Sequence, residues 1–302
     1  MALPLGNCAI CGAYGPLTFE HIPPESAFND RRVMLADMQR LLSNQDWQGF
    51  ENPKGKYKQR GAGDYTLCGK CNNDTGHWYG PQYVKWAYEG MRHLQTIGHA
   101  GASLRLPYNI QPLPVLKQIM AMFASACGPS FFSSAPEIRR WVLNPDLPGL
   151  SDRFKIYCYF ISPKSRSTRQ AGITGLVQVG VGSSTFAEIA FPPFGYILCL
   201  DSLPNDRGLA DISFFRKFRR REFQVIYLNI PIREVNSFFP GDFRTMDEIK
   251  KQYLASAEGA LKSIPSEVSA CLTPAPPTAP TRQRTGTAPP RTPPAAGRRP
   301  PA

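Results

Sequence analysis

The sequence predicts an α+β protein whose N-terminal part binds zinc. Two Cys-x-x-Cys pairs, Cys8/Cys11 and Cys68/Cys71, stand near the start of the chain, and residues 154–229 contain several alternating apolar runs typical of antiparallel strands. Residues 271–302 hold ten of the 30 prolines and five arginines but no acidic residue. We therefore expect a zinc-knuckle domain with a trailing helix over 1–100, an α+β domain of unknown function with a mainly antiparallel sheet over 110–265, and a disordered tail over 271–302.

Composition favours a polyanionic partner. The 302 residues carry a formal net charge of +12, which remains basic when the arginines of the tail are left out. This balance indicates nucleic acid, although a basic surface can also be simply solvated. No apolar run approaches a membrane span and Met1–Gly6 do not form a signal peptide, so we expect a cytoplasmic protein without a membrane partner. A second copy of the chain, or a protein partner, could bind through 110–265.

The N-terminal part alternates short strands, loops and helices. Pro23 and Pro24 should end a first strand, and Pro81 should interrupt a helix because proline removes a backbone hydrogen bond. The polar stretch 43–64 contains Lys54, Lys56, Lys58 and Arg60 and could be either a solvated insertion or a loop that contacts phosphate. The expected elements are a strand over 17–22, a weak helix over 25–42, a short strand over 65–67, a helix from about Cys71 or Asn72 to Pro81, and a second helix to Ile97.

The second half has the composition of a core of its own. Apolar residues at helical spacing predict helices over 114–127 and 136–143. The Thr245-Met-Asp-Glu248 segment is a capping-box pattern that should open a last helix through about Ser263. Residues 212–221 are basic and aromatic together, and they could contact phosphates or form a solvated basic face. Strands are expected over 154–161, 172–181, 186–191, 196–200 and 223–229.

The four paired cysteines predict a zinc site. In a chain without secretory signals, Cys-x-x-Cys pairs indicate a metal before disulfides, and four thiolates suit tetrahedral Zn²⁺. Gly12 lets the backbone turn after the first pair. A zinc ion with four protein ligands has no open position, so we expect a structural ion. The other cysteines are single; Cys127, Cys158 and Cys199 lie among apolar residues and should be buried, inert thiols.

Three polar residues between and after the knuckles carry the candidate chemistry. Hydrolysis of a phosphodiester needs a base for water and a cation for the phosphate. His21 can be the base, since histidine exchanges protons near neutral pH. Glu20 and Asn72 can supply oxygen ligands to Mg²⁺ or Mn²⁺. Neighbouring residues of a strand face opposite sides, so Glu20 can join His21 only if the backbone twists there or the ion sits beside the strand edge.

This ordered set, Cys8/Cys11, Glu20-His21 and Cys68/Cys71-Asn72, resembles the zinc-knuckle variant of the HNH (ββα-metal) endonuclease superfamily over residues 8–80. Phage junction-resolving nucleases and many bacterial HNH proteins carry this pattern. The resemblance implies a treble-clef-like ββα fold, His21 as general base, and a catalytic divalent ion held by Glu20 and Asn72. Two departures are that Glu20 stands where aspartate is usual, and that the insertion before Cys68 is long. The remainder resembles uncharacterised bacterial proteins with such a head.

Each residue also has a plainer interpretation. His21 could pack beside the knuckle or hydrogen-bond a backbone carbonyl, and Asn72 could be a helix N-cap. Asn73 and Asp74 compete for the role of Asn72, and His77 could be a further ligand or a surface histidine. His93 and His99 have no evident partners. The chain therefore leaves two functions open: a metal-dependent DNA hydrolase, or a non-catalytic zinc module that binds nucleic acid or protein.

Overall fold

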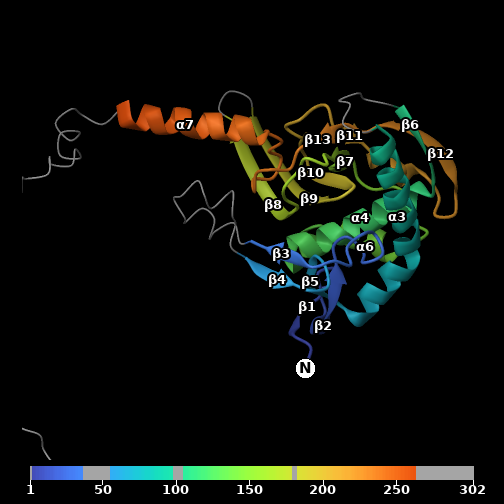
Figure 1. The fold of residues 1–302 in the computed structure, drawn as a ribbon. Coiled ribbons are helices and arrows are strands. Elements are labelled where there is room, and N and C mark those ends of the chain that lie inside the picture. Colours follow the sequence, from blue (N-terminus) through green and yellow to red (C-terminus); the bar gives the residue numbers. More distant parts are fainter. Residues whose placement is uncertain (1, 37–54, 98–104, 179–181, 263–302) are drawn as a thin grey trace, which may run out of the picture. The chain divides into compact units, whose positions relative to one another are not determined.

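A computed structural model describes residues 2–36, 55–97, 105–178 and 182–262. Residues 1–252 form one compact unit, and a second unit begins at Tyr253. The predicted disordered tail over 271–302 lies outside the described residues, as does most of the predicted loop over 43–64. Within the described part, the structure confirms an α+β protein with antiparallel sheets (Figure 1).

The N-terminal part is a small antiparallel sheet followed directly by a long helix. Its three strands pair in the order β1-β2-β5, and β3 and β4 form a separate two-stranded ribbon. Helix α3 begins at the residue after β5, so the second Cys-x-x-Cys pair spans the strand-to-helix junction. The bounds are β1 Leu5–Asn7, β2 Tyr14–His21, β3 Val33–Leu35, β4 Lys56–Lys58, β5 Gly63–Cys68 and α3 Gly69–Ile97.

Helix α3 corrects one sequence prediction. It continues without a break through Pro81, where we expected two helices. Proline removes one backbone hydrogen bond and usually kinks a helix, and Figure 1 shows α3 changing direction along its length. The helix persists because it is anchored on both sides of Pro81 by fully buried aromatic residues, Tyr79 and Trp86. The predicted weak helix over 25–42 is also wrong in its described part, where β3 forms instead.

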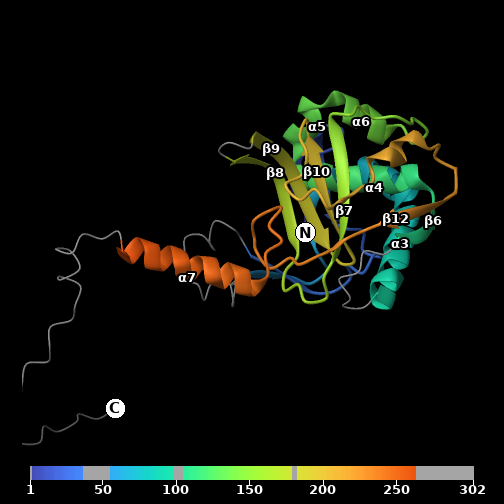
Figure 2. The same ribbon diagram turned by 90° about the horizontal axis from the view of Figure 1, so that it is seen from above.

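A buried helix lies at the centre of the second half. Helix α4, Pro112–Cys127, matches the predicted helix and is buried at every residue from Pro112 to Ser125. It packs against α3 on one side and against strands of the large sheet on the other (Figures 1 and 2). The short helices α5, Pro129–Ser134, and α6, Pro136–Leu143, follow it, and the second of these matches the prediction.

The large sheet has the order β11-β7-β10-β9-β8, and β13 pairs in parallel with β7. All its other pairings are antiparallel, as predicted. Two elements were not predicted from the sequence. One is β6, which pairs with β12 in a separate ribbon, and the other is the 3-10 helix η1 in the basic aromatic stretch. The bounds are β6 Arg105–Ile110, β7 Phe154–Ile161, β8 Arg169–Gln178, β9 Gly182–Phe191, β10 Phe194–Leu200, β11 Ala210–Asp211, η1 Ser213–Lys217, β12 Gln224–Asn229 and β13 Ile232–Arg233.

The main buried cluster draws on both halves of the first unit. It runs from Cys8 and Leu67 through Trp86 to Phe160 and Phe215. Trp86 of α3 stacks on Phe194 of β10, and its Nε1 donates to Tyr196 Oη at 2.9 Å. The division into domains over 1–100 and 110–265 stays a prediction, because shared packing does not say which segments fold alone.

The last described element is α7, Met246–Lys262. The predicted capping box is present: the Thr245 backbone N–H donates to Glu248 Oε2 at 2.7 Å, and the Glu248 N–H donates to Thr245 Oγ1 at 3.2 Å. Among the described residues, no helix has both the length and the apolar character needed to cross a membrane.

Candidate functional site

The four paired cysteines come together as one cluster. The Sγ atoms of Cys8, Cys11, Cys68 and Cys71 all lie within 4.8 Å of one another, and those of Cys11 and Cys68 are 3.8 Å apart. Tetrahedral zinc with Zn–S bonds of about 2.3 Å places its sulfur atoms ~3.8 Å apart. The donor type, number and spacing therefore fit a zinc ion, and in the described part of the chain no other group of three or more His, Cys, Asp or Glu side chains is close enough to share an ion.

Backbone hydrogen bonds hold the two cysteine pairs against each other. The Cys8 N–H donates to Ala13 O, and the Gly12 N–H donates to Cys8 O, both at 2.9 Å, which closes a tight turn. Gly12 has φ +79°, a left-handed conformation that favours glycine. The Ala9 N–H donates to Thr66 O of β5 at 2.9 Å, so the turn is fixed to the strand that ends at Cys68.

Electrostatics explains why a cation suits this cluster. A hydrogen bond from Cys71 lowers the pKa of Cys8, while that same contact raises the pKa of Cys71, and burial raises the pKa of Cys11. One thiolate is thus stabilised by its neighbours, but each further negative charge is opposed by the first. A bound cation removes this opposition and allows all four sulfur atoms to act as thiolates.

Glu20 lies on β2 where the strand pairing is irregular. The register between β2 and β5 shifts between Thr18 and Phe19, just before Glu20. The Glu20 side chain is buried, and no hydrogen bond or ion pair from the described residues reaches its carboxyl. Burial raises the pKa of Glu20 to about 8. A buried carboxyl without a cationic partner is expected either to keep its proton or to bind a cation.

His21 ends β2 with a fixed ring orientation. Its Nε2 lies 2.7 Å from the carbonyl oxygen of Arg60. A carbonyl oxygen only accepts, so Nε2 carries the proton, and Nδ1 is left with a lone pair. The ring also packs edge-on against Phe19, with centroids 4.9 Å apart. The carbonyl contact that was the plainer interpretation of His21 is therefore present, and it selects the tautomer that can accept a proton at Nδ1.

Asn72 joins the first turn of α3 to β2. Its Nδ2 donates to Thr18 Oγ1 at 3.0 Å and to the Phe19 carbonyl at 3.1 Å. Both bonds use the amide nitrogen, so Oδ1 remains for another donor or a cation. Helix α3 begins three residues earlier, at Gly69, and Asn72 is therefore inside the helix and is not its N-cap.

The three predicted site residues share one pocket. A cavity of about 580 Å³ between β2 and α3 is lined by Glu20, His21 and Asn72. Gln118 of α4 also lines this cavity, and its Oε1 is buried without a partner among the described residues. The sequence analysis missed Gln118, and nothing in its local pattern marks it, because only the packing of α4 on α3 brings it there.

The competing polar residues have other surroundings. Asn73 and His77 are exposed on α3, and Asp74 pairs with Lys70 at 2.5 Å. His93 is buried, with Nε2 2.9 Å from the carbonyl oxygen of Pro107. None of these lines the pocket that contains His21. His99 lies outside the described residues.

The described single cysteines and the basic stretch over 212–221 lie outside the pocket that contains His21. Cys158 and Cys199 are buried and Cys127 is half-buried, and burial raises the pKa of all three thiols. In the basic stretch over 212–221, Arg216 pairs with Asp152, and Arg220 lies 3.7 Å from Asp146.

No protein-family model, curated protein or solved structure matches the chain. Its function therefore has to be inferred from the residues of the site and their geometry.

Proposed function

We propose that the chain is a metal-dependent HNH-type endonuclease that hydrolyses phosphodiester bonds in DNA. The observation that carries this proposal is the single pocket lined by Glu20, His21 and Asn72. Further support comes from the order of the elements: two antiparallel strands lead directly into a helix, and a four-cysteine cluster sits at the strand-to-helix junction. A treble-clef identity for this part belongs to the same proposal.

In this proposal His21 is the general base. Its Nδ1 accepts a proton from water, while the Arg60 carbonyl accepts the N–H of Nε2 and keeps the ring in place. The resulting hydroxide oxygen bonds to phosphorus as the bond from phosphorus to the leaving oxygen breaks. The leaving oxygen takes a proton from solvent. The products are one strand end with a phosphate monoester and one strand end with a hydroxyl.

Glu20 and Asn72 would hold Mg²⁺ or Mn²⁺ beside that base. The carboxylate of Glu20 and Oδ1 of Asn72 are hard oxygen donors of the kind these ions prefer. When bound, such an ion neutralises the charge that develops on the phosphate and the leaving oxygen. The hydrogen bonds from Asn72 Nδ2 to Thr18 and Phe19 keep Oδ1 in place, so this donor is oriented before an ion arrives.

The cysteine cluster would serve this pocket without taking part in the reaction. Zinc at four sulfurs joins the Cys8–Cys11 turn to the end of β5 and the start of α3. Asn72 immediately follows Cys71, so the metal would set the position of the first helical turn relative to β2.

The test is cleavage of supercoiled plasmid by the full chain with Mg²⁺ or Mn²⁺. We expect nicking by the wild type and a loss of at least roughly 100-fold in His21→Ala, whose proton acceptor is gone. The matched control is His77→Ala, an exposed histidine on α3 that should cleave as the wild type does. Zinc content should be one per chain in all three proteins. Salt-sensitive DNA binding without cleavage under any divalent ion would instead favour the non-catalytic zinc module.

A further inference from the structure

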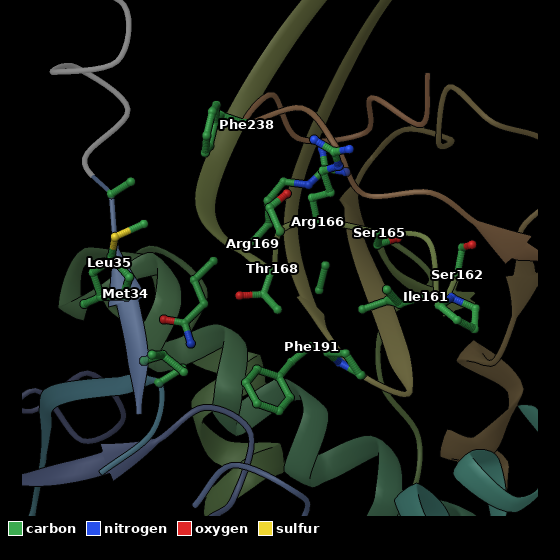
Figure 3. A pocket seen from close by; sticks show the side chains of 18 of the residues that line it. Met34, Leu35, Ile161, Ser162, Ser165, Arg166, Thr168, Arg169, Phe191 and Phe238 are labelled. Atoms are coloured by element: carbon green, nitrogen blue, oxygen red, sulfur yellow. The ribbon is translucent and has the colours of Figure 1, made fainter. Parts of the chain in front are cut away.

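A second cavity lies away from the His21 pocket. It has a volume of about 760 Å³ and is bounded by β3, the C-terminal half of α3, the loop from β7 to β8 and the turn from β9 to β10. Figure 3 shows Met34 and Leu35 on one side and Arg166, Arg169 and Ser165 across the cavity. The candidate catalytic residues Glu20, His21 and Asn72 do not line it, so a ligand bound here would not depend on the proposed nuclease activity.

The polar side of this cavity has an excess of positive charge. Two arginines line it, and none of the described lining residues is aspartate or glutamate. The charge of Arg169 is compensated by the fully buried Glu188, whose Oε2 lies 3.3 Å from Nη1 of Arg169. Nη2 of Arg169 donates to the Asp242 carbonyl at 2.9 Å. Both Glu188 oxygens are occupied, one by Tyr159 Oη and the other by the Gly241 N–H and Arg169.

Arg166 is the cation that remains uncompensated. It is exposed, and none of the described acidic residues forms an ion pair with its guanidinium group. Its backbone is nevertheless fixed, because the Arg166 N–H donates to Asn236 Oδ1 at 3.3 Å. A guanidinium without a carboxylate partner among the described residues is well suited to an anionic oxygen group, which it can meet with two parallel N–H donors.

Hydroxyl groups that line the cavity add further donors. Ser165 Oγ accepts the Val235 N–H at 2.8 Å, and Ser162 Oγ accepts the Lys164 N–H at 3.2 Å. Each of these hydroxyls is used as an acceptor, so its own hydrogen can be donated elsewhere. Thr168 also lines the cavity, and Figure 3 shows its hydroxyl in the space between the two sides. Hydroxyl donors and an arginine without an acidic partner among the described residues are groups that bind phosphate oxygens, and all of them line this one cavity.

The opposite side is apolar and partly open to solvent. Met34 is 36% exposed and Leu35 is 39% exposed, so both offer apolar surface to a ligand in the cavity. Phe191 and Phe238 contribute aromatic rings to the same cavity. Contact with a flat, weakly polar ring system would remove this apolar surface from water, which favours binding.

We propose that this cavity binds a nucleotide, with its phosphate at Arg166, Ser165 and Thr168 and its base against Met34, Leu35 and Phe191. The cavity volume suits a ligand of that size. A mononucleotide in solution and the phosphorylated end of a nucleic-acid strand share this chemistry.

The test is calorimetric titration of the full-length, zinc-loaded chain without Mg²⁺, using AMP, adenosine, inorganic phosphate and a short DNA strand with a 5′-phosphate. We expect AMP to bind at least tenfold more tightly than adenosine or phosphate alone, because only AMP reaches both sides. Arg166→Ala should weaken AMP binding about ten- to hundredfold through loss of a charge-assisted hydrogen bond. Thr168→Val should weaken it less.

The matched controls are Arg207→Ala, an exposed arginine outside the cavity, and His21→Ala, which removes the other pocket's base. Both should bind AMP as the wild type does. Tighter binding of the phosphorylated strand than of AMP would identify the strand end as the ligand, and the reverse would identify the free nucleotide. Absence of AMP and strand binding, or binding unchanged in Arg166→Ala, would overturn the proposal.

Discussion

Replacement of Glu20 by glutamine tests the electrostatics of the candidate catalytic pocket. The Glu20 carboxyl is buried and has no ionic partner among the described residues, and burial raises its pKa from 4.5 to about 8. The unfolded chain releases this proton near pH 4.5, whereas the folded chain keeps it until about pH 8. The free energy of unfolding should therefore fall as pH rises through this interval.

The size of the effect follows from the two pKa values. A difference between 4.5 and about 8 corresponds to roughly 5 kcal/mol of folding free energy, fully present below pH 4.5 and lost above pH 8. Glutamine has nearly the same shape and does not titrate. Glu20→Gln should thus resemble the wild type within about 1 kcal/mol at pH 5 and should be more stable by several kcal/mol at pH 9.

The assay is urea unfolding of both zinc-loaded proteins at pH 5, 7 and 9 without Mg²⁺, followed by tryptophan fluorescence. Comparing the variant with the wild type at each pH cancels the titration of other groups. Added Mn²⁺ should stabilise the wild type at pH 9 and leave Glu20→Gln unchanged, because metal binding requires the carboxylate. A difference between the proteins that stays the same from pH 5 to pH 9 would refute this reasoning.

Three further substitutions test other parts of the structure. Lys117 is fully buried, and burial lowers its pKa to about 7, so the unfolded chain holds more protons than the folded chain between pH 7 and 10.5. In urea unfolding, the free energy of unfolding of the wild type should therefore rise by about 1.4 kcal/mol per pH unit in this range, relative to that of Lys117→Met. The same pH dependence in both proteins would contradict this. Cys71→Ser should contain less zinc by elemental analysis and unfold at a lower temperature, whereas Cys158→Ala should keep one zinc per chain. Equal zinc content in the two variants would contradict a zinc site made of these four sulfur atoms. Gly63→Ala places a Cβ in steric conflict with the Glu20 carbonyl oxygen of β2 and should lower the free energy of unfolding by several kcal/mol, measured by thermal unfolding. Gly15→Ala, where the Cβ meets open space, should lower it by less than about 1 kcal/mol. Similar losses in the two variants would show that β2 and β5 are not this close.

Local sequence patterns predicted several elements of the fold. The Cys-x-x-Cys pairs, the helical spacing of α4 and the Thr245–Glu248 capping box each depend on residues close together in the chain, and each is present in the structure. The continuation of α3 through Pro81 was not predictable in this way. Its energetic support comes from the tertiary burial of Trp86 against Phe194, which outweighs the local cost of proline.

The pocket itself required the fold. Glu20, His21 and Asn72 were chosen from sequence order, but the Arg60 carbonyl that fixes the His21 ring comes from 39 positions further along the chain. Gln118 reaches the same cavity from α4. No periodicity signals such contacts, since they arise from the packing of separate elements.

The most direct measurement of the central claim is anomalous X-ray diffraction at the zinc and manganese absorption edges. The crystals would contain the full chain and would be grown with Mn²⁺ at a pH high enough for Glu20 to be ionised. We predict one zinc peak between the sulfur atoms of Cys8, Cys11, Cys68 and Cys71. We predict a separate manganese peak in the pocket, within bonding distance of the Glu20 carboxylate and Asn72 Oδ1 and near His21 Nδ1. A pocket without manganese, or manganese bound with Glu20 and Asn72 turned away, would contradict the account.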